Sequence, residues 1–152
     1  MAEQITNIEK YENYREQMGR LKRAIGAKFF LEAVFIEYAI MEDRLESIVR
    51  RAGYWTFQKD RVRVNINDKL KKMVNALESK DETFCKYFDS EFIKEIDTWK
   101  TKRNPYIHDL LNKKITTADL EEFALRGQEI VKKLNSSSTN YKRALQRQSE
   151  KN

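Results

Sequence analysis

The chain has only one cysteine, one proline, one histidine and four glycines among its 152 residues. An all-β fold needs many tight turns, so the scarcity of glycine and proline excludes that class and favours helices. One histidine and one cysteine are too few for a zinc centre, and no acidic segment has the spacing of a calcium loop. The scattered glycines form no phosphate-binding loop. We therefore expect neither a metal nor a cofactor.

Long hydrophobic runs are also missing. The longest apolar stretch, Phe29 to Met41, is interrupted by Glu32 and Glu37, which excludes a membrane span. The N-terminus is polar, unlike a signal peptide. The lone Cys85 forms no disulfide within the chain, which indicates a reducing compartment. We expect a cytoplasmic protein without a membrane partner, with Cys85 as a buried structural thiol among Phe84, Tyr87 and Phe88.

Charge is abundant, at 36% of residues, and the net charge is +6. The segment 136–152 contributes half of it, with Lys142, Arg143, Arg147 and Lys151 against Glu150. A basic surface is a pointer to nucleic acid. An ordinary solvated surface explains the same charge at least as well.

The periodicity predicts an all-α fold, a compact bundle of roughly four to six helices. We expect one domain over residues 1–135, and a polar, basic tail over 136–152 that is mobile or a loose helical extension. A helix from about Ala27 to Ala52, stopped by Gly53, is apolar on more than one face. It should therefore be central, or covered by a partner as well.

The expected helix starts carry capping residues. Thr6 with Glu9 and Thr116 with Asp119 have the spacing of capping boxes. Asn67 or Asp68, and Ser90, are further candidates for N-caps. A short helix is expected near Glu82 to Phe88. Tyr54 to Asn67 is expected to be a loop that packs its aromatic side chains, including Trp55 and Phe57, with a short hairpin or strand as the alternative.

The only histidine and the only proline lie together in Arg103-Asn104-Pro105-Tyr106-Ile107-His108. Proline disfavours a helical conformation in the residue before it and suits the first position of a helix, while asparagine suits the N-cap. We therefore expect one helix to end near Arg103 and another to start at Pro105. A kink in one continuous helix is the alternative. A helix start here would offer free N–H groups to a phosphate.

These residue types can cleave RNA without a metal. An imidazole can take the proton of the ribose 2′-hydroxyl or protonate the leaving 5′-oxygen, and a guanidinium can stabilise charge on the phosphoryl oxygens. One histidine does not serve efficiently as both base and acid in one step. A homodimer with two facing copies of the stretch would supply the second imidazole.

The six residues resemble the Arg-X4–6-His signature of HEPN domains, with the polar residue that this family commonly carries after the arginine. The length and helical pattern agree over roughly Thr6 to Leu134. The resemblance implies a metal-independent endoribonuclease that acts as a homodimer, often a toxin or an antiphage effector. It implies that Arg103 is the phosphate ligand, His108 the general acid/base, and Asn104 a polar site residue that orients or caps.

Some family members add carboxylates from a neighbouring helix, for which Glu37, Glu42 and Asp43 are candidates. Solvated or intrahelical ion pairs are the preferred interpretation of each. Some HEPN toxins carry a tyrosine two residues after the histidine, which a partner enzyme modifies. Here that position is Leu110, so that form of control is not supported, although an antitoxin or another regulatory protein remains an expected kind of partner. The alternative function is a non-catalytic helical module that binds RNA or protein.

Overall fold

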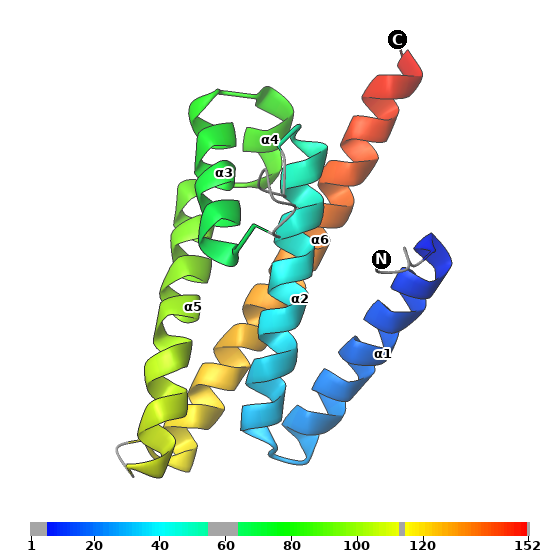
Figure 1. Ribbon diagram of the computed structural model, residues 1–152. Coiled ribbons are helices and arrows are strands. Elements are labelled where there is room, and N and C mark those ends of the chain that lie inside the picture. Colours follow the sequence, from blue (N-terminus) through cyan, green and yellow to red (C-terminus); the bar gives the residue numbers. More distant parts are fainter. Residues whose placement is uncertain (1–5, 55–63, 113–114, 152) are drawn as a thin grey trace.

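The computed structural model describes residues 6–54, 64–112 and 115–151, and these form an all-α bundle (Figure 1). The aromatic residues expected to pack in the loop, Trp55 and Phe57, lie outside the described residues. Among the described residues there are six helices and no strand: α1 (Asn7–Gly26), α2 (Phe30–Arg51), α3 (Ile66–Glu78), α4 (Glu82–Tyr87), α5 (Ser90–Leu111) and α6 (Thr117–Lys151).

Side-chain caps set the helix starts. The predicted capping boxes are confirmed: Thr6 and Glu9 exchange hydrogen bonds of 2.7 and 3.1 Å, and Thr116 and Asp119 exchange bonds of 3.0 and 3.1 Å. The predictions for two other N-caps were wrong by one to three residues. α3 is capped by Asn65 instead of Asn67 or Asp68, and α5 by Asp89 instead of Ser90. In both cases the earlier side chain accepts a backbone N–H three residues on, which is the usual reach of an N-cap.

The long apolar helix is central, as predicted. In Figure 1, α2 lies in front of the slanting α6, between α1 on one side and α3 and α5 on the other. Its most extensive contact is with α6, and it also packs on α1 and α3. Half of its residues are buried, including Ala33, Met41, Leu45 and Ile48. The helix ends just before Gly53, whose φ of 94° an L side chain rarely adopts.

The C-terminal segment is a helical extension, one of the two expected forms, but its first part is packed and not loose. α6 continues through Ser136-Ser137-Ser138-Thr139 and reaches Lys151 without a break. Tyr141 is 1% exposed, and its ring packs edge-on against Phe84 and Phe88 at 5.6 Å each. The packed part of the chain therefore extends beyond residue 135, because α4 supplies an aromatic surface that holds this part of α6.

Cys85 is exposed, so the prediction of a buried thiol is wrong. On the short helix α4 the neighbouring Phe84 faces the core, which turns the next side chain toward solvent. None of the helices in the described ranges is both long and apolar enough to cross a membrane.

Candidate functional site

The stretch with the lone histidine lies inside α5. Pro105 is within the helix, which runs without interruption from Ser90 to Leu111. The prediction of a new helix at Pro105 with Asn104 as its N-cap is therefore wrong, and the alternative of one continuous helix is correct. The missing N–H of proline removes the usual bond to the carbonyl of Thr101, but α5 is anchored on both sides of this point. The free N–H groups of a helix start are thus absent from this place.

Arg103 is fixed by a neighbouring helix. Its guanidinium carbon lies 3.7 Å from the centre of the Tyr38 ring on α2, a close cation–π geometry. The side chain is half-buried, and its Nε has no hydrogen-bond partner among the described residues. Burial raises the pKa of Tyr38, and the positive charge of Arg103 partly opposes that rise. The contact holds the charged group in place, and the Nε itself is shielded from solvent.

His108 and Asn104 are exposed on the same helix, and His108 lies in its last turn. Five residues on an ideal α-helix correspond to a rise of about 7.5 Å and a rotation of about 140°. The side chains of Arg103 and His108 thus leave α5 in different directions. Asn104, adjacent to Arg103, has no capping role in a continuous helix and presents its amide to solvent.

The three candidate carboxylates on α2 do not join this stretch. Glu42 pairs with the buried Lys69 at 3.5 Å, and Asp43 pairs with Lys10 at 3.2 Å and Arg44 at 2.5 Å. Burial alone would raise the pKa of Asp43, but these two cations hold it below its usual value. Both carboxylates are thus in ion pairs, but Lys69 and Lys10 belong to α3 and α1, so only the pair of Asp43 with Arg44 is intrahelical as predicted.

Glu37 is a different case, because it is fully buried in the core. Both carboxylate oxygens lack a hydrogen-bond partner among the described residues, and burial raises the pKa of Glu37 to about 9. The side chain fits only because residue 127 on α6 is glycine. A Cβ there would lie 2.3 Å from Oε1 of Glu37 and 2.7 Å from Cζ2 of Trp99. Helical periodicity placed Glu37 on α2 but gave no signal that it faces α6.

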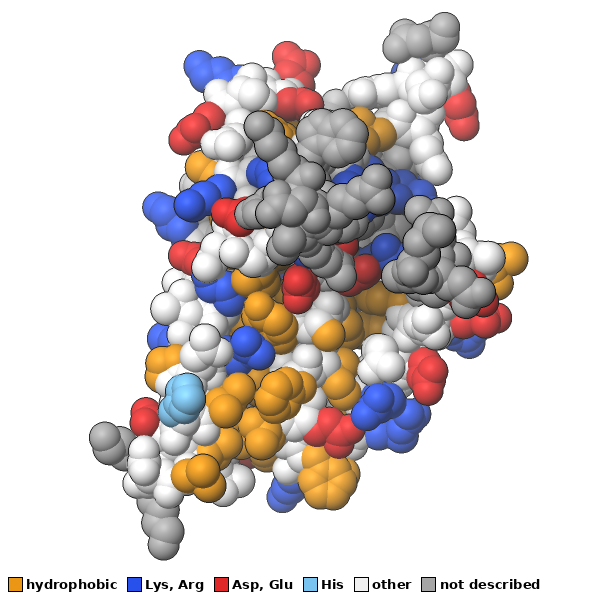
Figure 2. Space-filling model, viewed as in Figure 1, with side chains coloured by type: hydrophobic (Ala, Val, Ile, Leu, Met, Phe, Trp, Pro, Cys, Tyr) orange, Lys and Arg blue, Asp and Glu red, His pale blue; other side chains and the backbone are white. Residues whose placement is uncertain are grey.

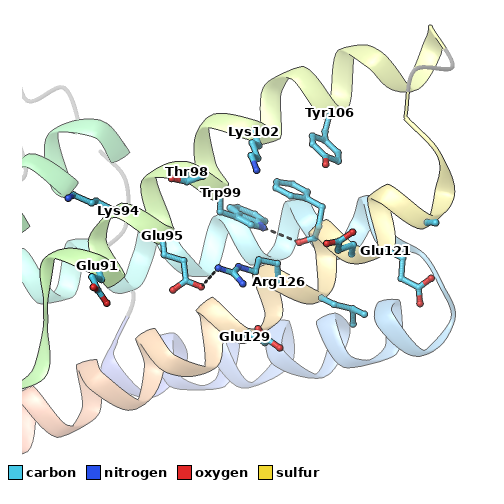
Figure 3. A pocket seen from close by; sticks show the side chains of 14 residues that line it. Glu91, Lys94, Glu95, Thr98, Trp99, Lys102, Tyr106, Glu121, Arg126 and Glu129 are labelled. Atoms are coloured by element: carbon cyan, nitrogen blue, oxygen red, sulfur yellow. Dashed lines mark hydrogen bonds and ion pairs between the residues drawn. The ribbon is translucent and has the colours of Figure 1, made fainter.

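A surface groove of about 910 Å³ lies between α5 and α6 (Figure 3). Its floor is an aromatic stack in which Phe123 lies between Trp99 and Tyr106, with ring centres 4.8 and 4.5 Å apart. The indole N–H of Trp99 donates to the carbonyl of Phe123 at 3.0 Å. Trp99 therefore joins α5 to α6. No spacing within α5 predicts this groove, since Phe123 belongs to another helix.

This groove does not hold the motif, and its charge does not suit a phosphate. Neither Arg103 nor His108 lines it. Five glutamates face three cations in its walls, although the chain as a whole is basic, and one pair, Glu95 with Arg126, bridges α5 and α6 at 3.2 Å. The charged residues that line it are Glu91, Lys94, Glu95, Lys102, Glu121, Glu122, Arg126 and Glu129. The face that carries Arg103 is therefore the better place for an anion.

In comparisons with known proteins, no family model, no curated protein and no solved structure matches the chain. The likeness to HEPN domains thus rests on the six residues from Arg103 to His108 and on the helical fold. In the described part of the chain, no group of three or more His, Cys, Asp or Glu side chains is placed to hold a metal ion.

Proposed function

We propose that the protein is a metal-independent endoribonuclease whose site is shared between two copies of the chain. The observation that carries this proposal is the half-buried guanidinium of Arg103, held on Tyr38 of α2, on the same helix as an exposed imidazole. A pre-positioned cation binds phosphate without the entropy loss of ordering a flexible side chain.

In the proposed reaction, the ribose 2′-hydroxyl loses its proton to one imidazole and its oxygen attacks the adjacent phosphorus. The bond from phosphorus to the 5′-oxygen breaks, and that oxygen takes a proton from a second, protonated imidazole. The products are a 2′,3′-cyclic phosphate and a 5′-hydroxyl end. Arg103 stabilises the negative charge on the phosphoryl oxygens, and Asn104 is available as a further donor to the RNA.

The divergence of Arg103 and His108 along α5 favours a site between two chains. One helix does not direct both side chains at one point, but the arginine of one copy and the histidine of another can meet across a twofold axis. Exposed apolar side chains lie next to the motif. Leu31 and Phe35 are 36% and 51% exposed, and with Tyr38 they follow the i, i+4, i+7 spacing of one face of α2.

Figure 2 supports this arrangement, because it shows hydrophobic side chains gathered over the lower parts of α2 and α5, beside the pale-blue histidine. An exposed apolar patch of this kind is typical of an interface. We expect two copies to bury this patch against each other, which would place both Arg103–His108 stretches at the edge of the interface.

The test is cleavage of single-stranded RNA by the purified protein in the presence of EDTA. His108→Ala should lower the rate by at least about a hundredfold, as expected for loss of a general acid/base. Because His108 is exposed, this change should leave the free energy of unfolding within about 0.5 kcal/mol. Thr101→Ala, at an exposed position on the same helix, is the matched control and should retain full activity.

A mixing experiment tests the shared site. Wild-type protein mixed with an excess of His108→Ala protein should lose activity more steeply than dilution predicts, because a mixed dimer keeps only one of the two imidazoles that the reaction uses. Full activity of the His108→Ala protein would contradict the proposal. A loss of activity that follows simple dilution would contradict the two-chain site.

The exposed apolar face also favours a second candidate function, a non-catalytic helical module that binds RNA or a regulatory protein such as an antitoxin. Phe29, 62% exposed, extends the face at the start of α2. Binding without RNA cleavage would support this module over the enzyme. A toxin or antiphage role in the cytoplasm, where a free thiol stays reduced, belongs to the first proposal.

A further inference from the structure

A second furrow, of about 490 Å³, lies between α4 and the C-terminal part of α6. Lys86 and Tyr87 line it from α4, and Arg147 and Lys151 from α6. Glu82 is the one carboxylate among its described lining residues. Arg143 precedes Arg147 by one helical turn, so Arg143, Arg147 and Lys151 form a stripe along α6. The basic residues of the C-terminal segment therefore lie along one face of a helix.

Folded elements hold this cationic furrow in shape. Tyr141, at the start of the basic segment, is buried against Phe84 and Phe88 of α4 and its C-cap. Farther along, the amide of Gln148 donates to the hydroxyl of Thr83 at 2.5 Å. The cations on α6 are therefore fixed relative to Lys86, in place of the independent motion expected for a tail.

The cations of the furrow are available to a ligand. Within the described ranges, the ion pairs involve other residues, and neither Lys86 nor the α6 stripe takes part in one. The Lys86 ammonium lies 5.7 Å from the centre of the Tyr87 ring, and this ring is half-buried at the wall of the furrow. An aromatic face beside several unpaired cations is the usual composition of a surface for single-stranded nucleic acid.

We propose that this cationic furrow binds single-stranded RNA, with Lys86, Arg147 and Lys151 contacting phosphates and Tyr87 stacking on a base. The acidic groove between α5 and α6 would repel the same ligand. The furrow lies at the end of the molecule opposite the last turn of α5 (Figure 1). Binding here does not depend on cleavage at Arg103 and His108, so either proposal can fail alone.

The test measures binding of the full chain to a fluorescent 16-nucleotide RNA whose 2′-hydroxyls are methylated. This probe keeps the phosphates but lacks the nucleophile for cleavage, so binding is separated from the proposed enzyme activity. In about 0.1 M salt, the triple variant Lys86→Gln/Arg147→Gln/Lys151→Gln should bind ten- to a hundredfold more weakly. The slope of log K against log salt should shrink by about 2, as expected for three lost phosphate contacts on a single strand.

The matched control is Arg15→Gln/Lys22→Gln/Lys132→Gln, which removes the same charge from exposed positions on α1 and α6 and should change the affinity little. Tyr87→Leu should weaken binding about tenfold, while Tyr87→Phe keeps the ring and the affinity. Equal losses in the two triple variants would overturn the proposal, because general charge would explain them. Binding to vesicles of anionic phospholipid, without binding to the RNA, would also overturn it.

Discussion

Glu37 lies in an environment that disfavours its charged form. Its carboxyl group lies in the core with no hydrogen-bond partner in the described part of the chain, and Gly127 leaves it just enough room. Burial disfavours the charged form, and the neutral acid is kept across the range in which an exposed glutamate ionises. The free energy of unfolding should therefore depend on pH.

We predict that the stability of the protein falls as the pH rises from about 5 to 9. In this range the folded state keeps the proton of Glu37, whose pKa is about 9, whereas the unfolded state releases it. The folded state thus binds more protons, and stability decreases by up to about 1.4 kcal/mol per pH unit from this group. Glu37→Gln should remove that slope, as measured by urea unfolding at pH 5, 7 and 9.

Glu16→Gln, which changes an exposed carboxylate on α1, is the control for this measurement and should keep the wild-type slope. If Glu37→Gln leaves the pH dependence unaltered, the carboxyl group is ionised in the folded protein, and its place in the core is not as described.

Single residues were predictable where the signal was local. The capping hydrogen bonds of Thr6 and Thr116 follow from a spacing of three residues. The contact of Arg103 with Tyr38 joins positions far apart in the sequence, and no spacing within α5 indicates it. Periodicity likewise gave no reason to bury Glu37, since a charged residue normally faces solvent.

At the scale of the element, α5 continues through a proline. An N-cap at Asn104 and a continuous helix make opposite predictions for Asn104→Ala. Loss of a cap would cost about 1 kcal/mol, whereas in the middle of a helix alanine is preferred to asparagine by a few tenths of a kcal/mol. We predict a neutral or slightly stabilising effect in thermal unfolding.

Asp89→Ala provides the comparison on the same helix. Asp89 accepts the backbone N–H of Phe92 at 2.8 Å, so its replacement should cost about 1 kcal/mol. A comparable loss for Asn104→Ala would mean that α5 is broken at Pro105 after all. The helix start was wrongly predicted at Pro105 because Asn-Pro is a strong local signal. The packing of α5 on α3 and α6, which favours a continuous helix, involves residues far away in the sequence.

At the scale of the whole molecule, the core extends along α6 from Phe123 to Tyr141. We predict that Tyr141→Ala lowers the free energy of unfolding by about 3–5 kcal/mol, the usual cost of truncating a large buried aromatic side chain. Tyr11→Ala, at a position 63% exposed on α1, should cost far less. Urea unfolding of the two variants measures the difference, and similar values for both would show that the C-terminal part of α6 is undocked.

The error about this segment has a physical cause. Four consecutive Ser and Thr residues have modest helix propensity, so they indicated the end of the last helix. Their flanks, however, are packed on either side, by Leu134 on one and Tyr141 on the other, and tertiary contacts outweigh propensity. The all-α class and the central position of α2 were predictable because they depend on patterns summed over many residues.

The exposed thiol of Cys85 has a consequence for the behaviour of the protein in air. Two copies can oxidise to a disulfide through α4, since each has a single cysteine and its thiol is exposed. Such a covalent pair would join the molecules at the end of the bundle opposite the start of α2 and the last turn of α5 (Figure 1), and would hold the Arg103 stretches apart. Self-association should therefore be studied with a reductant present, because otherwise a cross-link formed by oxygen would be mistaken for native assembly.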